Sequence, residues 1–549
     1  MEHHRIKIET DELQEALGPF LHGYKTTAAR ISAIEAALGS AAGKFWRDEL
    51  GKWTVRMVPV DLLVPEEYRR WRPLVRDAMG FVVSRLAANR LAPKVVEQME
   101  LAADTPPEAR LLRFIAKVPG LQKIGQVLAR NRKLDPRVRR ALSELENGIS
   151  DVSINEIRAI IVQQLRPQLA KYAVEIDSAI LCEASVSAVV RFTWRNPESG
   201  RRERGVFKVL KPYIPSCYAE DMKILQHLAG YLARKHRAGG VRLGGLAETL
   251  TEIRLLLERE VDFRGEQTTL LNALQMYRSV PGVRVPRLIE PLSTDIITAL
   301  TQESGVKVTE ALGRADTDRA SVAERLAEVL IAIPALTRDK DAVFHADPHA
   351  GNLLYDKRRG ELVILDWALT EHLTRAQRKN VLMLVLMMIL RDVDGACGAV
   401  ERLRQRHAAE DQEQTRIVRE HVKRFLDALP LFEVPAAMGA MRLLDEIAME
   451  GVRFPAALLM FRKASFTLDG VLEDIAGSSI RMDSAITRYA LEHWAATCTA
   501  LFSLLSPSDW MALDWSAMTF ASRMGARVVL RPWTWVPELL HSRAAQTAQ

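Results

Sequence analysis

The chain has 549 residues, of which 48% are hydrophobic and 26% are charged, and its formal net charge is +7. This composition excludes an intrinsically disordered protein, and the length suffices for two or three subdomains. The four cysteines form no CxxC pair, which argues against a zinc ribbon or a disulfide framework and favours a reducing compartment. The excess of positive charge lies in separate helical stretches without a recognition module, so nucleic-acid binding is not expected.

Helices dominate the first part of the chain. Apolar residues at spacings of three and four predict helices from 1 to about 110, with further helical segments at 119–136 and 136–147. Near residue 177 the pattern changes, because 178–194 and 203–212 are rich in Val, Phe and Thr and are joined by a polar turn. These two stretches predict a β-hairpin.

The remainder of the chain combines helices with a few strands. Helical patterns are expected at 218–237, 246–276 and 318–338, and strand-like pieces at 284–293, 295–303 and 362–366. The apolar run 380–390 is too short to cross a membrane and predicts a core helix. Helices continue to about residue 540, and this order predicts an α+β protein with a helical N-terminal extension.

The loop FHADPHAGNLL, residues 344–354, carries the clearest chemistry. Phosphoryl transfer needs a carboxylate at the acceptor, oxygen ligands for Mg2+ and a Lys on the phosphates. Protein kinases supply these groups in the motif HRDxxxxN and in a later Asp that follows a strand. Asp347 and Asn352 have the same spacing, and Asp366 ends the predicted strand 362–366. We therefore expect Asp347 to be catalytic and Asn352 and Asp366 to bind Mg2+.

A zinc site is a competing interpretation of the same loop. His345, Asp347 and His349 are residue types that bind zinc. Such a site leaves Asn352 and Asp366 without a role, so the kinase-type interpretation is favoured.

A kinase-type site also requires a Lys on an upstream strand. Lys208 in GVFKVLKP has apolar neighbours on both sides, as expected of a Lys held beneath a nucleotide, whereas Lys211 should point to the opposite side. A carboxylate on a helix should hold Lys208. The stretch LLLEREVDFRGEQ offers Glu260, Asp262 and Glu266 for this purpose.

Four separated motifs resemble the UbiB (AarF, coenzyme-Q-associated) family of atypical kinases over roughly 105–480. They are KIGQ (Lys123 to Gln126), the ExD motif (Glu260 to Asp262), FHADPHAGN and the late helical stretch 451–475. The resemblance implies that Lys123 and Gln126 belong to an extension folded over the active site, where they meet Glu260 and Asp262. It also implies that Lys208 contacts nucleotide phosphates.

The same resemblance places the nucleotide itself. The Ala-rich nucleotide loop of the family corresponds to 182–185, which includes Ala184 and Ser185, and the adenine-binding hinge corresponds to Thr301, Gln302, Glu303 and Ser304. Two departures are expected to weaken nucleotide binding. Glu183 brings a negative charge close to the phosphates, and Ala368 replaces the Gly of DFG, which has greater freedom at positive φ.

The fold implied by the resemblance is a protein-kinase-like two-lobed α+β fold with a small mixed β-sheet in the N-lobe and a mainly helical C-lobe. We expect five segments along the chain: a helical N-terminal region (1–110), a KxGQ-type helical extension (111–175), the N-lobe (176–305), the C-lobe with the catalytic loop (306–490) and a helical C-terminal segment (491–549).

The expected function is that of an ATP- and Mg2+-dependent atypical kinase or ATPase, and the resemblance implies that the extension occludes the cleft to protein substrates. The resemblance implies a lipid or isoprenoid small molecule as partner, in isoprenoid-quinone or other lipid metabolism. One alternative is a small-molecule phosphotransferase of the aminoglycoside or choline kinase type, which often has Trp after the strand Asp, as in Asp366-Trp367. The other is a pseudokinase scaffold, favoured by Glu183 and Ala368.

The location is expected to be cytoplasmic, with two alternatives for the segment 493–540. Its mixture of Trp, Leu, Val and Arg is typical of interfacial segments, which predicts peripheral contact with the inner face of a membrane. Packing of an amphipathic helix on the kinase core explains the same pattern. A homodimer and a partner in a biosynthetic complex are both compatible with the sequence.

Overall fold

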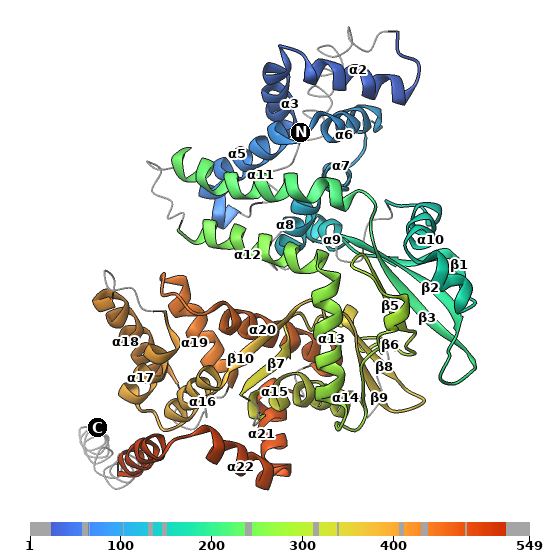
Figure 1. Cartoon of the computed structure of the whole chain (residues 1–549). Coiled ribbons are helices and arrows are strands. Elements are labelled where there is room, and N and C mark those ends of the chain that lie inside the picture. Colours follow the sequence, from blue (N-terminus) through green and yellow to red (C-terminus); the bar gives the residue numbers. More distant parts are fainter. Residues whose placement is uncertain are drawn as a thin grey trace, which may run out of the picture. The chain divides into compact units, whose positions relative to one another are not determined.

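A computed structural model describes most of the chain in two units (Figure 1). The described residues are 23–57, 64, 66–102, 104–129, 136–144, 151–235, 244–310, 318–337, 340–405, 411–429, 437–477 and 480–522. Unit 1 comprises Met1–Leu271 and Arg287–Gln302, and unit 2 comprises Asn272–Pro286 and Glu303–Gln549. The division after Gln302 falls within the predicted hinge, while the five predicted segments stay predictions.

Unit 1 contains the helices of the N-terminal region and those around its sheet. The predicted helical character of 1–110 is confirmed for the described residues. The helices are α2 (Thr27–Gly39), α3 (Gly43–Met57), η1 (Glu66–Trp71), α5 (Arg72–Arg85), α6 (Ala88–Glu100), α7 (Pro107–Ile115), α8 (Pro119–Ala129), α9 (Pro136–Glu144), α10 (Ile154–Lys171), α11 (Ile214–Lys235), α12 (Gly244–Val261), the short η2 (Glu290–Leu292) and α13 (Phe263–Tyr277), which continues into unit 2.

The sheet of unit 1 has four antiparallel strands in the order β1-β2-β3-β5. They are β1 (Glu175–Glu183), β2 (Ser187–Arg195), β3 (Arg202–Leu210) and β5 (Ile297–Thr301). The predicted hairpin is confirmed as β2–β3. Its first stretch also supplies part of β1, because a turn closed by the Ala184 N–H donating to Ser187 O at 2.8 Å divides it. The predicted mixed sheet is antiparallel throughout in this unit.

Alternation along the strands decides which side chains reach the core of this sheet. Phe192 on β2 and Phe207 on β3 are buried and stack with ring centroids 3.9 Å apart. They belong to one apolar cluster with Ile157 and Ile161 of α10, which covers this face of the sheet. Lys208 follows Phe207, so its side chain projects from the opposite face.

The predicted helix 246–276 is two helices, α12 and α13, separated at Asp262. The Gly265 N–H donates to Asp262 Oδ1 at 2.9 Å, and the Glu266 N–H donates to Asp262 O at 3.0 Å. Asp262 therefore caps the start of α13, a position where a short acidic side chain satisfies a free backbone N–H. The change of helix direction gives Glu260 and Glu266 separate surroundings.

Two small sheets lie in the described part of unit 2. One has the order β4-β9-β8-β6, with β4 and β9 parallel, and the other pairs β10 with β7. The predicted strand 362–366 is confirmed as β9, whereas the predicted strand 284–293 is reduced to the two residues of β4. The strands are β4 (Val283–Arg284), β6 (Val306–Lys307), β7 (Asp341–His345), β8 (Leu353–Asp356), β9 (Glu361–Ile364) and β10 (Thr370–Thr374).

Helices make up the rest of unit 2, as predicted. They are α14 (Asp318–Ala327), η3 (Glu328–Ala332), α15 (Ile333–Leu336), η4 (Ala350–Asn352), α16 (Arg375–Ile389), α17 (Val393–Leu403), α18 (Asp411–Ala428), α19 (Ala437–Met449), α20 (Ala456–Ala476), α21 (Met482–Glu492), α22 (Trp494–Leu504) and a helix at 507–522. The α+β fold class is confirmed.

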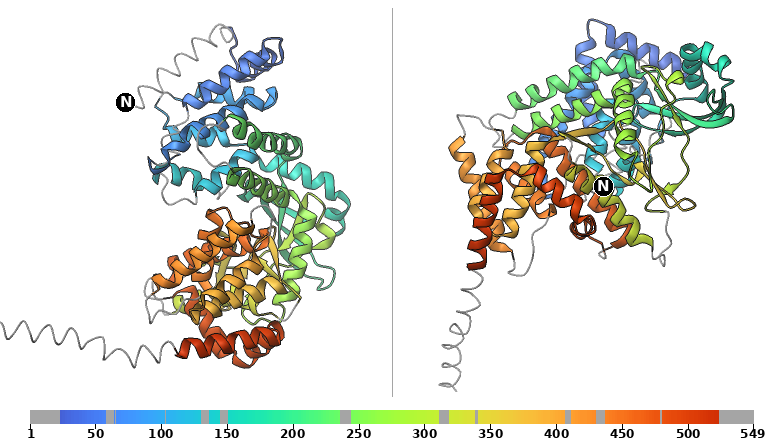
Figure 2. Two further views of the ribbon diagram at one scale, coloured as in Figure 1. Left: turned by 90° about the vertical axis from the view of Figure 1, so that its left-hand side faces the viewer. Right: turned by 60° about the horizontal axis from the view of Figure 1, so that its bottom comes forward.

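The membrane question concerns two segments of unit 2. The run 380–390 lies largely in α16, whose Met383, Leu384 and Met387 are buried, so the predicted core helix is confirmed. Among the residues that the structure describes, no helix has the length and apolar character needed to span a bilayer. The red helices α21 and α22 are visible in Figure 2, and the predicted membrane-surface stretch beyond 522 lies outside the described residues.

Candidate active site

Lys208 is held by a carboxylate on a helix, as a kinase-type Lys should be. Lys208 Nζ forms an ion pair with Glu266 Oε1 at 2.7 Å, and both side chains are largely buried. Strand β3 presents Lys208 on the face opposite Phe207, and the first turn of α13 brings Glu266 to that face. Of the three candidate carboxylates, Glu266 is the one that the structure pairs with Lys208.

Lys211 lies in different surroundings from Lys208. Its side chain is fully buried, and its Nζ pairs with Asp151 Oδ1 at 2.8 Å and with Glu183 Oε2 at 2.9 Å. The Tyr213 hydroxyl donates to Asp151 Oδ2 at 2.8 Å. This arrangement corrects one expectation, because the negative charge of Glu183 is compensated by a buried ammonium group. No sequence pattern indicates the contribution of Asp151 and Tyr213.

Three of the predicted residues form a second cluster in unit 1. Lys123 of α8 pairs with Glu260 Oε1, and the Ser185 hydroxyl donates to Glu260 Oε2 at 2.9 Å. The KxGQ helix, the ExD motif and the β1–β2 turn are thus joined through one carboxylate. Ala184 lies in the same turn, with its N–H on Ser187 O. Gln126 belongs to α8, but its side chain lies outside the described residues.

The predicted hinge divides between the two units. In unit 1, Thr301 ends β5 and its hydroxyl accepts from the Arg287 N–H at 2.9 Å, and the Gln302 N–H donates to Arg204 O at 3.2 Å. In unit 2, Glu303 Oε2 pairs with Arg284 Nε at 2.8 Å. The Ser304 hydroxyl donates to Asp356 Oδ2 at 2.6 Å, which is the main reason that the pKa of Asp356 is lowered to about 2.

The predicted catalytic loop of unit 2 is held by contacts among its own residues. The Asn352 side-chain amide donates to Asp347 O at 3.2 Å, and the His349 N–H donates to the same oxygen at 2.8 Å. His345 is fully buried next to this turn, and its Nδ1 accepts from the Asp347 N–H at 3.2 Å. The backbone of Asp347 is therefore held on both sides, at its N–H and at its carbonyl oxygen.

Strand register brings Asn352 and Asp366 together. In the antiparallel pair β8–β9, Leu353 lies opposite Ile364, and the Leu365 N–H donates to Asn352 O at 2.8 Å. Asn352 precedes one strand and Asp366 follows the other, so the two residues meet at the same end of the ladder. A carboxylate and an amide oxygen are hard ligands of the kind that Mg2+ prefers. The donor set therefore fits a magnesium ion.

Asp366, rather than Ala368, has the unusual backbone conformation at this turn. Among the described residues, positive φ at the turn falls on Asp366 (φ +51°). Asp tolerates the left-handed region better than most residues, and Ala368 donates its N–H to Asp366 Oδ1 at 3.3 Å. Trp367 is buried, where it packs against His345 with ring centroids 5.1 Å apart. The expected cost of replacing the Gly of DFG is thus not present at Ala368.

The zinc alternative does not fit the geometry. His345 Nε2 bonds Leu365 O at 3.1 Å, while its Nδ1 accepts from the Asp347 N–H, so both ring nitrogens have backbone partners. Burial lowers the pKa of His345, which keeps the ring neutral. His349 Nε2 lies 4.0 Å from Asp347 Oδ2. Within the described part of the chain, no group of three or more His, Cys, Asp or Glu side chains is arranged to hold a metal.

Comparisons with known proteins agree with the motifs. An uncharacterized protein of Synechocystis sp. is 27% identical over 64% of this chain and 59% of that protein. Protein Activity of BC1 complex kinase 7, chloroplastic, from Arabidopsis thaliana is 26% identical over 64% and 50%, and probable protein kinase UbiB of Histophilus somni is 28% identical over 42% of each chain. The chain thus spans about half the length of these curated relatives.

A solved structure, the Rv3197–erythromycin complex from Mycobacterium tuberculosis, is 18% identical, covers 66% of this chain and 92% of that chain, and has a TM-score of 0.38. The family model described as ABC1 atypical kinase-like domain matches residues 144–399. The matched segment contains Lys208, Asp347, Asn352 and Asp366, and the curated relatives include several UbiB proteins. Residues 144–399 are therefore similar to the ABC1 atypical kinase-like domain, in agreement with the UbiB-type motifs of the sequence.

Proposed function

We propose that this chain is an ATP- and Mg2+-dependent atypical kinase or ATPase that serves isoprenoid-quinone or other lipid metabolism. The observation that carries the proposal is the meeting of Asn352 and Asp366 at one end of β8–β9, next to the fixed backbone of Asp347. This arrangement supplies two oxygen ligands and one further carboxylate. The lipid part of the proposal rests on the UbiB-type motifs.

Each of these residues has a distinct role in the proposed reaction. Lys208, oriented by Glu266, binds phosphate oxygens, and the Ala184–Ser185 turn and the segment 301–304 contact the nucleotide. Asp347 orients the acceptor hydroxyl or water and accepts its proton. Asn352 and Asp366 hold the magnesium ion, which when bound neutralises charge on the phosphates.

Two observations weaken the alternatives. Lys123 of the KxGQ motif pairs with Glu260 of the ExD motif. A phosphotransferase of the aminoglycoside or choline type gives no reason for these two motifs to be present. The pseudokinase scaffold was favoured by Glu183 and Ala368. Glu183 is paired with Lys211, and Ala368 is not at positive φ, so neither residue argues against a working nucleotide site.

Phosphate release from MgATP by the purified chain tests the proposal. We expect Asp366→Asn to lower the rate by about 100-fold or more, because an electrostatic contact made at the reacting phosphates is lost. Asp394→Asn is the matched control, since Asp394 is an exposed residue of α17 paired with Arg419. Equal rates of phosphate release for the wild type and Asp366→Asn would contradict the proposal that the chain is an enzyme with Asp366 in its active site.

The acceptor is tested separately. Isoprenoid lipids, an aminoglycoside and choline are each added to the reaction. The rate of ATP turnover and the phosphorylation of each compound are then measured. Stimulation by the isoprenoid lipids alone supports the lipid role, while phosphorylation of choline or the aminoglycoside would replace it with the small-molecule alternative.

We also propose that the C-terminal helices of unit 2 contact a membrane surface. Trp494, Phe502 and Trp515 are 62%, 68% and 71% exposed, and Trp and Phe are favoured at the lipid interface. Flotation with liposomes should therefore weaken when these three residues are changed to Ser in the full chain. Met449→Ser is the control, because Met449 is 82% exposed on α19. Unchanged flotation of the triple variant would contradict this proposal.

A further inference from the structure

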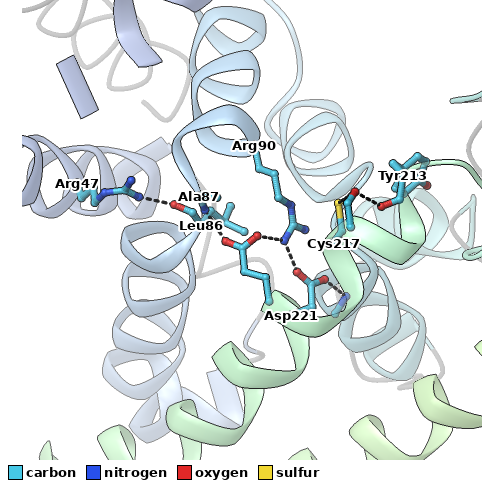
Figure 3. Close-up of polar contacts among 10 residues, drawn as sticks. Arg47, Leu86, Ala87, Arg90, Tyr213, Cys217 and Asp221 are labelled. Atoms are coloured by element: carbon cyan, nitrogen blue, oxygen red, sulfur yellow. Dashed lines mark hydrogen bonds and ion pairs between the residues drawn. The ribbon is translucent and has the colours of Figure 1, made fainter. Parts of the chain in front are cut away.

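Two adjacent carboxylates of α11 bind the N-terminal ends of two other helices in unit 1 (Figure 3). Glu220 accepts a hydrogen bond from the N–H of Ala87, the residue before α6. Asp221 Oδ2 accepts one from the N–H of Gly120, in the first turn of α8, at 2.8 Å. The first N–H groups of a helix have no partner within the helix and favour a negative charge. Helices α6, α8 and α11 are thus joined at one point.

Arg90 of α6 bridges the two carboxylates. Its Nη1 donates to Glu220 Oε2 at 2.8 Å and to Asp221 Oδ1 at 2.6 Å. Asp221 is almost fully buried, and burial raises its pKa, while Arg90 opposes this rise. Within the described residues, Arg90 Nε and Nη2 are buried without a hydrogen-bond partner. Unsatisfied buried donors reduce the net stability of the junction.

The junction lies one helical turn from the predicted site. On α8, Gly120 precedes Lys123 by three residues, so the two are about one turn apart. Lys123 pairs with Glu260, which also accepts from the Ser185 hydroxyl. The first turn of α8 is therefore held at its start by Asp221 and at its end by Glu260.

We propose that Arg90, Glu220 and Asp221 form a latch through which the N-terminal helical region holds Lys123 on Glu260. Opening the latch frees the start of α8, so Lys123 leaves Glu260, and Glu260 and Ser185 become available to a nucleotide. The three latch residues are positioning residues, because they act through Lys123. The effect on nucleotides rests on the proposed function, whereas the seating of Lys123 does not.

Lysine acetylation of the full chain, measured by mass spectrometry at each Lys, reports whether the Lys123 amine is protected by its contact with Glu260. This measurement does not depend on enzymatic activity. Lys123 is 6% exposed, and fully buried Lys211 of the same unit serves as the internal reference. The variants are Arg90→Met, Arg90→Lys and Asp221→Asn, where Asn keeps an acceptor for the Gly120 N–H but loses the charge. The matched control is Arg30→Met, which breaks the more exposed pair of Arg30 with Glu100 in the same helical region.

We expect Arg90→Met and Asp221→Asn to raise acetylation of Lys123 relative to Lys211 by roughly 10-fold or more, since each loses a charged hydrogen bond. Arg90→Lys should restore part of the protection, and Arg30→Met should leave the ratio unchanged. A parallel rise at Lys123 and Lys211 would mean general destabilisation and would overturn the latch. So would an unchanged Lys123.

A kinetic cycle tests the consequence for ATP. Arg90→Met should lower the KM for ATP in the wild-type background, because the open latch makes Glu260 and Ser185 available to the nucleotide. In a Lys123→Met background, Arg90→Met should have no further effect on this KM. Independent, additive effects of the two changes would show that Arg90 does not act through Lys123. If no variant hydrolyses ATP, the proposed function fails, while the acetylation ratio still decides whether the latch exists.

Discussion

Lys211 forms an ion pair with Glu183 at 2.9 Å inside unit 1, directly beside the turn that carries Ala184 and Ser185. A second carboxylate, Asp151, contacts the same ammonium group at 2.8 Å. Glu183, which is expected from the sequence to oppose phosphate binding, is thus part of a buried ion-pair cluster beside this turn. This relationship predicts an effect on stability.

Replacing Lys211 with Met should destabilise unit 1 by about 3–5 kcal/mol, because two buried carboxylates lose their shared cation. Adding Glu183→Gln should recover part of the loss, since one of the two charges is removed. Urea unfolding measures both effects. Arg202→Met is the control, since its pair with Glu175 is exposed and should contribute less than about 1 kcal/mol. A similar loss of unfolding free energy in Lys211→Met and Arg202→Met would contradict the role of Lys211.

Glu266 should be needed to hold Lys208 in position. Glu266→Gln removes the charge that faces Lys208 Nζ at 2.7 Å, and loss of such a supporting contact costs about 10- to 100-fold in activity. We expect this loss in kcat/KM for ATP, measured by steady-state phosphate release. Glu258→Gln on α12 is the matched control, because Glu258 forms a half-exposed pair with Arg254. If Glu266→Gln were as active as the control, Glu266 would not be needed to position Lys208 for nucleotide binding.

The backbone at Asp366 allows its chemistry to be separated from its structural role. Asn tolerates the left-handed region as Asp does, whereas Ala costs about 1 kcal/mol there. Asp366→Ala also removes the acceptor of the Ala368 N–H. We therefore expect Asp366→Asn to unfold at the wild-type urea concentration and Asp366→Ala to unfold earlier. Equal unfolding of the two variants would show that the positive φ carries no cost.

Local spacing explains which parts of the site could be predicted from the sequence. Asp347, Asn352 and Asp366 lie on one loop and one short antiparallel pair, so their separations along the chain restrict where they can meet. Lys208 could be chosen over Lys211 because alternation along a strand sends their side chains to different sides. The hairpin β2–β3 followed from composition and a polar turn.

Contacts between distant segments could not be predicted in the same way. Gly120 and Asp221 are 101 residues apart, and no spacing rule links the start of α8 to the middle of α11. Glu183 pairs with Lys211, which follows β3, and accepts a hydrogen bond from the N–H of Asp151, which precedes α10. Neither partner is close to Glu183 in the sequence, so the compensation of its charge could not be predicted. The break between α12 and α13 was missed because apolar periodicity continues through Asp262, whose capping role depends on the fold.

Burial of Lys94 on α6 predicts a pH dependence of stability. Burial lowers the pKa of Lys94 from 10.5 to about 8, although Lys94 Nζ donates to Arg113 O at 2.7 Å. At neutral pH both the folded and unfolded states are protonated, and the full cost, on the order of 3 kcal/mol, is present. Between pH 8 and 10.5 the folded state loses its proton first, so this cost is relieved and stability rises with pH.

The variant Lys94→Met isolates this contribution. As the pH is raised from 7.5 to 10, the unfolding free energy of the wild type should increase relative to that of Lys94→Met by up to about 3 kcal/mol, because the variant has no amine to lose a proton at this position. Urea unfolding at each pH measures it. Lys52→Met is the control, because Lys52 is largely exposed on α3 and should show no such trend. A difference that stays constant with pH would mean that Lys94 keeps an ordinary pKa, and α6 would then be packed less tightly against α7 than the buried Lys94 implies.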